Sequence, residues 1–436
     1  MTDEKVYRET ARKGTIEGDL YIENGRVEAE EDKLIVTGVI RCERDCELVG
    51  NIEASELFSN RGDITIRGSV KAGLIDLRHG RLEVTGSVEV NELRVSKSLS
   101  VDEDLIALKI RVGGSINVIG NVNAERARVG GSLKVEHDAK IDNLNVGGSC
   151  RVEGKVTSKL IDVGGSFKAG EVESEEIDSG GSFTTYGPVS LESIRVGGTV
   201  KVGGGAIRRR IEVGGTFKSK EHLEFGDISV GGTVKLEGGG KGEIIDIGGT
   251  LSAEEKLSFT KLDVGGTVKL YGGGMGEELI VGGTMKCRGD LVISDHVKVG
   301  GKIAVDGDLS AKSIRVGGKL EADKVVAEQY IETNILYTRN GAKATRIEIE
   351  RRGKVRGPLI GDIITIKDRA SVEDIYADRI QLRRGCRAGN LYGNVIWIDT
   401  GCDVDSVTYT DELRVDASVR IRRGSQKSEE LPEPPI

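Results

Sequence analysis

The chain has 436 residues, of which 63 are Gly but only six are Phe and one is Trp, so it must turn often around a thin core. The formal net charge of −8 argues against nucleic acid as a partner, because a phosphate backbone requires a basic surface. No stretch is apolar enough for a signal peptide or a membrane span, so we expect a cytoplasmic protein.

The N-terminal quarter divides into two parts. Residues 1–15 are largely polar and are predicted to form a tail. Residues 16–109 contain LIVTG, ITIRG and LEVTG, whose alternation of apolar and polar residues predicts irregular β-helix coils. Cys42 and Cys46 form C-x₃-C, half of a zinc-binding pattern, but the sequence offers no second half. No metal site is therefore predicted here.

A regular repeat occupies residues 110–325. Val-Gly-Gly-Ser/Thr recurs with its first Gly at 113, 130, 147, 164, 180, 197, 214, 231, 248, 265, 282, 300 and 317, and ten of the twelve intervals are 17 residues. The position three before this Gly is apolar in every copy, and so is the position three after it. The position directly before it is Val or Ile in all copies except Ser179. Alternation with period two predicts strands, and Gly-Gly predicts a corner with positive φ.

These coils must stack. One coil buries about five apolar side chains, each worth roughly 1.5–3 kcal/mol. Ordering each of its residues costs roughly 1.5 kcal/mol, so a coil alone would unfold. The sequence predicts one long all-β parallel β-helix with 17-residue coils, in which Phe167 lies on Phe183 and Ile161 on Ile177. The left-handed helix of hexapeptide acyltransferases is the alternative, since VGGSLK-VEHDAK-IDNLN scans as 6+6+5, but its hexads favour a period near 18.

No catalytic, cofactor-binding or metal-binding residue is predicted. The Gly runs at 203–205, 238–240 and 272–274 lack the following helix and G-K-[ST] of a phosphate loop, which indicates a second corner of the coil. The acidic residues are spread over outward positions. The four histidines, at 79, 137, 222 and 296, are too far apart to share a site. We therefore expect a protein that is not an enzyme and needs no cofactor.

Residues 326–423 continue the coils, and residues 345–423 resemble the bactofilins, which are polymer-forming cytoskeletal proteins. The resemblance rests on three features of each coil. Each coil begins with two apolar residues that alternate with polar ones, as in Ile364 and Ile366. A small residue lies four positions after the second of them, and an apolar residue follows the small one. The small residues are Gly353, Ala370, Cys386 and Cys402, and the apolar ones are Val355, Val372, Ala388 and Val404. Cys386 and Cys402 should stack within disulfide reach but stay reduced.

The resemblance implies a right-handed β-helix that joins end to end into filaments without nucleotide or metal, often near membranes. Membrane association stays open, because this sequence lacks an apolar N-terminal segment. The implied partner is a second copy of the chain, and other proteins are further candidates. The polar, Pro-containing residues 424–436 are predicted to be disordered.

Assembly would use the two ends of the β-helix, because an uncapped coil exposes backbone donors, acceptors and apolar side chains. The predicted polymerisation residues are Ile16, Leu20, Ile22, Val415, Val419 and Ile421. The alternative function is a monomeric β-solenoid spacer or protein-binding module. A β-helix carbohydrate-active enzyme ranks below both, because such a site needs clustered carboxylates.

Overall fold

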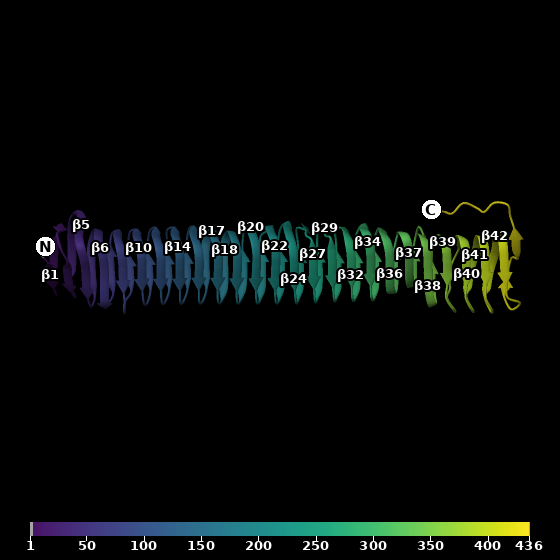
Figure 1. Ribbon diagram of the computed structural model, residues 1–436, viewed down its shortest axis with the longest axis horizontal. Coiled ribbons are helices and arrows are strands. Elements are labelled where there is room, and N and C mark those ends of the chain that lie inside the picture. Colours follow the sequence, from purple (N-terminus) through teal and green to yellow (C-terminus); the bar gives the residue numbers. More distant parts are fainter. Residues whose placement is uncertain (1–2, 436) are drawn as a thin grey trace. The chain divides into compact units, whose positions relative to one another are not determined.

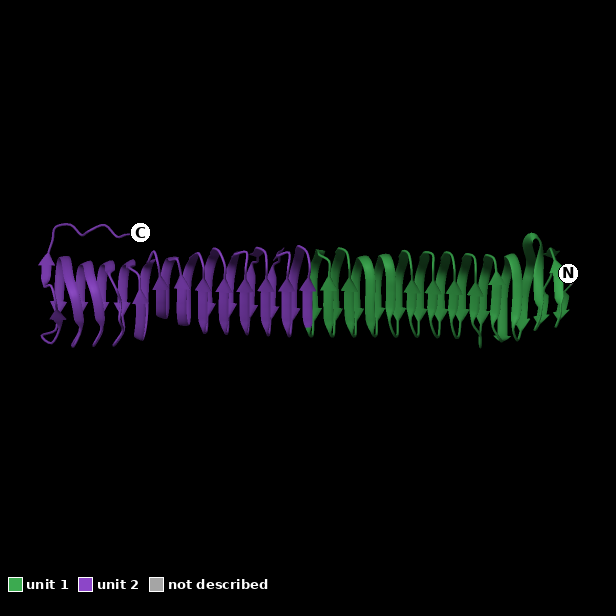
Figure 2. Ribbon diagram, turned by 180° about the vertical axis from the view of Figure 1, so that it is seen from behind, with its two compact units in different colours: residues 1–215 green, residues 216–436 purple. Residues whose placement is uncertain are grey.

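The computed structural model describes residues 3–435, and every regular element in this range is a β-strand (Figure 1). The chain divides into two compact units, residues 1–215 and residues 216–436, which Figure 2 colours separately. Within each unit the strands of successive coils pair in parallel, as in Leu105 with Val122 and Leu251 with Val268. The predicted all-β parallel β-solenoid with about 17 residues per coil is confirmed in both units.

The strands of the first unit are β1 (Glu4–Tyr7), β2 (Thr10–Lys13), β3 (Thr15–Ile16), β4 (Leu20–Glu23), β5 (Arg26–Glu43), β6 (Cys46–Arg61), β7 (Ile64–Arg67), β8 (Val70–Leu77), β9 (Leu82–Val84), β10 (Val88–Val95), β11 (Leu99–Val101), β12 (Leu105–Val112), β13 (Ile116–Val118), β14 (Val122–Val129), β15 (Leu133–Val135), β16 (Ala139–Val146), β17 (Cys150–Val163), β18 (Ser166–Ser179), β19 (Ser182–Thr185), β20 (Val189–Val196), β21 (Thr199–Val202) and β22 (Gly205–Val213).

The strands of the second unit are β23 (Thr216–Ser219), β24 (Leu223–Val230), β25 (Thr233–Leu236), β26 (Gly240–Lys241), β27 (Ile244–Ile247), β28 (Thr250–Ala253), β29 (Leu257–Ser258), β30 (Lys261–Val264), β31 (Thr267–Leu270), β32 (Gly274–Val281), β33 (Thr284–Cys287), β34 (Leu291–Val299), β35 (Lys302–Val305), β36 (Asp308–Ala322), β37 (Lys324–Thr338), β38 (Ala342–Arg356), β39 (Leu359–Ile366), β40 (Ile375–Leu382), β41 (Arg387–Ile398), β42 (Asp403–Val415), β43 (Arg420–Ile421) and β44 (Ser425–Lys427).

The coil made by β12 and β13 shows how the core is built. Its buried side chains are Leu105, Ala107, Ile110, Val112, Ile116 and Val118. A coil therefore has six inward positions, one more than the sequence indicated. The additional position is that of Ala107, and in later coils of this unit it holds the buried residues Ser158 and Ser174. Because some of its residues are polar, this position cannot be recognised as inward from a pattern of apolar residues.

The predicted stacking of coils is confirmed. Phe167 pairs with Phe183 and Ile161 with Ile177 in the ladders of β17, β18 and β19. The two Phe rings stack with their centroids 5.1 Å apart. The exceptional Ser179 is also buried, and its hydroxyl donates a hydrogen bond of 3.1 Å to the carbonyl of Gly165 in the preceding coil. A polar residue is thus accommodated in an apolar column because it reaches a backbone acceptor.

The Gly-Gly corners were expected to need positive φ, and this prediction is wrong. None of the Val-Gly-Gly glycines has φ in the left-handed region. They are glycines because successive corners lie very close together: a Cβ on Gly181 would lie 2.7 Å from the carbonyl oxygen of Gly165. Positive φ occurs instead in the three Gly runs, at Gly204, Gly239 and Gly273, where the chain turns a second corner.

The N-terminal tail predicted for residues 1–15 is also wrong over the described residues. β1 pairs with β4, and β2 pairs with β5, so Glu4–Lys13 belong to the solenoid. Only Val6 of β1 is buried, which explains why no apolar alternation was visible. The following coils differ in length, since Leu20 pairs with Ile40 and Val70 with Val88.

The predicted C-terminal tail is partly ordered. β44 pairs with β42, so Ser425–Lys427 extend the sheet. Residues 428–435 have no strand, and their trace folds back along the side of the second unit (Figure 1). The disordered segment predicted for 424–436 thus begins with a strand.

Candidate functional site

Of the N-terminal residues predicted to mediate polymerisation, Leu20 and Ile22 do not lie at an end, whereas Ile16 lies on β3, which pairs only with β5 among the described residues. Ile16, Leu20 and Ile22 are at most 2% exposed. β4, which carries two of them, lies between β1 and β5, and Ile22 pairs with Val6 on one side and Cys42 on the other. The prediction is wrong for Leu20 and Ile22, because residues 4–16 form a further coil. β1, β2 and β3 occupy the edge, and Ile16 of β3 is buried there.

The C-terminal residues do lie in the last coil. Val415 is 39% exposed, and Val419 and Ile421 are half-buried. Ile421 of β43 pairs with Val404 of β42, and among the described residues β43 and β44 have no partner beyond β42. Partly exposed apolar side chains and a free strand edge therefore coincide, a combination that favours pairing with another strand.

The stacked cysteines lie in the core beside this end. Cys386 and Cys402 immediately precede the paired residues Arg387 and Asp403, so they occupy equivalent positions in adjacent coils, as predicted. Both are free thiols, at most 2% exposed. The hydrogen bond with the Cys402 sulfur, together with burial, raises the pKa of the Cys386 thiol. The same hydrogen bond lowers the pKa of the Cys402 thiol to about 7, but that sulfur is buried and has little access to solvent.

Cys42 and Cys46 also point into the core, at 1% and 4% exposure. The hydrogen bond with Cys46, together with burial, raises the pKa of the Cys42 thiol. Among the described residues, no third ligand comes close enough to complete a metal site with them.

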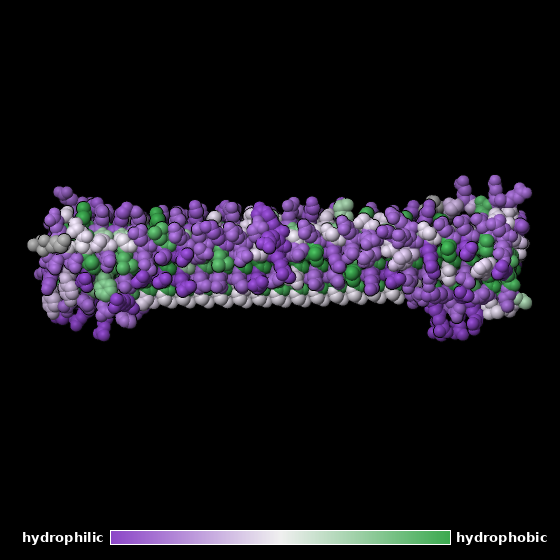
Figure 3. All heavy atoms as spheres, viewed as in Figure 1, coloured by the Kyte–Doolittle hydropathy of each residue, from purple (hydrophilic) through white to green (hydrophobic). Residues whose placement is uncertain are grey.

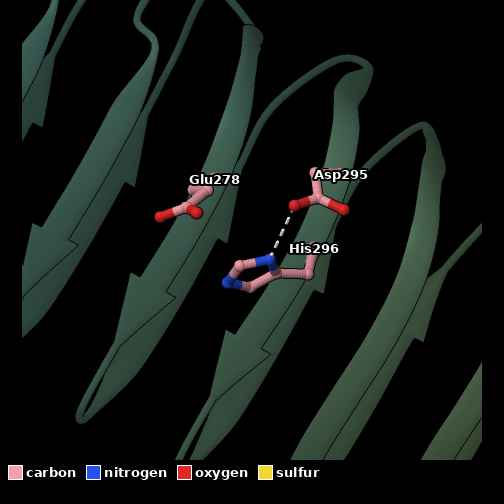
Figure 4. A group of neighbouring side chains, drawn as sticks. All are labelled: Glu278, Asp295 and His296. Atoms are coloured by element: carbon pink, nitrogen blue, oxygen red, sulfur yellow. Dashed lines mark hydrogen bonds and ion pairs between the residues drawn. The ribbon is translucent and has the colours of Figure 1, made fainter.

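Three potential metal ligands, which the sequence did not predict to form a site, lie close together. Glu278, on β32, and Asp295 and His296, on β34, each offer a ligand atom within 4.8 Å of the other two (Figure 4). The His296 ring lies between the two carboxylates, with Nδ1 3.1 Å from Asp295 Oδ2. The histidines were discounted because they are far from one another. The missed signal is the single 18-residue interval, between Gly282 and Gly300, that contains Asp295 and His296.

A second surface feature is a basic hollow of about 700 Å³ on the second unit. Six cationic side chains line it, against three acidic ones. The cationic residues are Lys269, Lys286, Arg288, Lys302, Arg339 and Arg356. Tyr271 and Tyr337 also line it, and Arg356 lies over the Tyr337 ring at 5.0 Å. This surface is positive although the whole chain is acidic.

Few large apolar side chains of residues 3–435 are exposed. The face shown in Figure 3 is predominantly hydrophilic, with scattered hydrophobic residues, and the exposed apolar side chains of the described residues are mostly isolated. Met275 and Val292, which pair on the flank of the second unit, are an exception. No helix that could span a membrane occurs in residues 3–435.

Comparisons of the chain with protein-family models, with curated proteins and with solved structures give no match. The resemblance to bactofilins over residues 345–423 therefore stays a prediction from the sequence.

Proposed function

We propose that this chain is a non-catalytic, bactofilin-like cytoskeletal scaffold of the cytoplasm that assembles end to end without nucleotide. The observation that carries the proposal is the last coil, where Val415, Val419 and Ile421 are partly exposed beside the free edge of β42–β44. At the other end, β1 and β2 pair on one side only among the described residues. Two such edges can continue one parallel sheet from molecule to molecule.

The junction should be concentration-dependent. Few apolar side chains would be buried at each end, whereas association costs roughly 4–15 kcal/mol in lost freedom of motion. Backbone hydrogen bonds between β42–β44 and β1–β2 would supply much of the specificity. The six buried free thiols fit a reducing compartment.

The experiment compares two double substitutions to lysine. Val419→Lys with Ile421→Lys places two charges at the proposed junction, and filaments of the purified protein should disappear in negative-stain microscopy and sedimentation. Met275→Lys with Val292→Lys is the matched control, because this exposed pair lies on the flank, and it should assemble like the wild type. A wild type that stays monomeric at high concentration refutes the proposal.

The second candidate function is a protein-binding module, and the basic hollow favours it. A monomeric wild type that still captured an acidic protein through Lys286 and Arg288 would support this alternative. Loss of capture in the Lys286→Glu, Arg288→Glu variant would assign the binding to the hollow.

A further inference from the structure

One coil of the Val-Gly-Gly array departs from the others by insertion. The interval from Gly282 to Gly300 is 18 residues, whereas ten of the twelve intervals are 17. The ladder between β32 and β34 shifts between Gly276 and Glu278, and the ladder between β34 and β36 shifts between Val292 and His296. The additional residue therefore lies in the outward corner of this coil. Inserted residues of this kind redirect side chains and are frequent next to functional sites.

The insertion determines where the two ligand-type side chains lie. Three consecutive residues, Ser294, Asp295 and His296, face outward between buried Ile293 and Val297. The preceding coil has only two at this corner, Glu277 and Glu278. His296 pairs with Glu278 in the ladder, so the ring lies beside that carboxylate, while Asp295 contacts it from the other side (Figure 4).

We infer that Glu278, Asp295 and His296 form a binding site for a divalent transition-metal ion, with Zn²⁺ as the first candidate. An imidazole with two carboxylates is a ligand set that Zn²⁺ accepts, whereas Ca²⁺ and Mg²⁺ prefer oxygen ligands alone. The two carboxylates would balance the charge of the ion. Three protein ligands leave a coordination position open for water or for a donor group from a partner molecule.

Two lysines form ion pairs with the carboxylates of the site. Lys261 Nζ lies 3.2 Å from Glu278, and Lys312 Nζ lies 3.9 Å from Asp295. Both lysine side chains are more than 40% exposed, so their ammonium groups can move into solvent when a cation binds. Displacing them costs affinity, and the site should bind Zn²⁺ more weakly than a structural site with four protein ligands.

The ion would join two neighbouring coils. Glu278 belongs to β32, and Asp295 and His296 belong to β34, so coordination would tie these strands together where their register is irregular. Because the ion would bind the folded chain and not the unfolded one, Zn²⁺ should raise the unfolding temperature. The site lies on the flank of the second unit, so this inference does not depend on end-to-end assembly.

The test is calorimetric titration of the purified, chelator-treated full chain with Zn²⁺, with the absorption spectrum of bound Co²⁺ as a second readout. We expect one ion per chain. His296→Ala, Glu278→Gln and Asp295→Asn should each weaken Zn²⁺ binding at least tenfold, because each variant removes or weakens one contact with the ion. His222→Ala is the matched control, because His222 is an exposed histidine of the same unit outside the cluster, and it should bind like the wild type.

Two outcomes overturn the inference. One is a wild type that binds no Zn²⁺ under these conditions. The other is a His296→Ala protein that binds Zn²⁺ as tightly as the wild type. If His296→Ala fails to fold, Glu278→Gln and Asp295→Asn test the inference, and binding as tight as in the wild type by both would overturn it. These variants should fold, because the side chains of Glu278 and Asp295 are 32% and 48% exposed and are not part of the core.

Discussion

The Val-Gly-Gly coils and the C-terminal coils turn their corners by different physical means. In the array, the corner glycines have ordinary φ, and Gly is needed because successive corners approach closely; a Cβ on Gly147 would lie 2.5 Å from the carbonyl oxygen of Gly130. In the C-terminal coils, Gly385 and Gly401 have φ of 69° and 70°. Around Gly401 no atom lies within 4 Å of an added Cβ.

The difference shows that Gly is required at the two kinds of corner for two separate physical reasons. The array requires the absence of a side chain, so nothing but Gly fits. The C-terminal corners require a left-handed backbone, which other residues adopt at a cost, and Arg352 and Arg369 do so with φ of 61° and 60°. This explains why the array repeats Gly-Gly strictly and the C-terminal corners vary.

The core differs between the two regions as well. The inward position three residues after the first Gly holds Phe167, Phe183 and Phe217 in the array. The corresponding position of the C-terminal coils, directly after the corner, holds Val372, Ala388 and Val404. There the small buried residues Ala370, Cys386 and Cys402 fill the corner. In three coils of the array this position thus holds an aromatic ring, whereas these C-terminal coils hold smaller side chains there.

The largest expected effect comes from removing one of these rings. Phe183→Ala deletes a fully buried side chain that stacks on Phe167, and it should lower the free energy of unfolding by about 3–5 kcal/mol. Cys402→Ala removes a single sulfur from the C-terminal core and should cost much less. Thermal and denaturant unfolding of the two variants measures the difference. Equal losses would contradict the contrast in core packing.

The two kinds of glycine can be separated by substitution. Gly181→Ala should cost about 1–3 kcal/mol through overpacking against the Gly165 carbonyl, and Gly181→Asn should be no better. Gly401→Ala should cost about 1–2 kcal/mol through its left-handed backbone, and Gly401→Asn should recover most of this loss, since Asn tolerates that conformation. Recovery by Asn at both positions, measured by unfolding, would refute the distinction.

The smallest expected effect concerns the ion pairs on the flank of the array. Lys218 and Lys235 hydrogen-bond to Glu237 and lower its pKa from 4.5 to about 2. A lowered carboxyl pKa stabilises the folded state above pH 4.5, and this contribution disappears as the pH falls from there toward 2.

Glu237→Gln should therefore destabilise the protein at pH 7, by less than about 1 kcal/mol because the pairs are solvent-exposed. The difference in stability between wild type and variant should shrink as the pH falls toward 2 and vanish below it, and the difference at pH 7 should shrink in high salt. A difference as large at pH 2 as at pH 7 would mean that Glu237 acts through packing and not through charge.

Several features were predictable from residues alone. The strict 17-residue interval required parallel stacking, and period-two alternation placed Phe167 on Phe183 and Ile161 on Ile177, as observed. The solenoid's N-terminal edge was not predictable, because an end coil is covered on one side only and Glu4–Lys13 therefore carry little apolar pattern. The physical reason for Gly-Gly was not predictable either, because the spacing of residues in the sequence does not show how closely the corners of two successive coils approach.

The sequence by itself determined the fold class and the register of the array, because a repeat of constant length brings each residue onto its counterpart one coil away. Tertiary structure alone decided three further matters: that Leu20 and Ile22 lie one coil in from the end, that the size of residues at the array corners is limited by contact, and that Glu278 meets Asp295 and His296. All three depend on distances between atoms of different coils. The last depends on one inserted residue, whose direction in space no periodic pattern specifies.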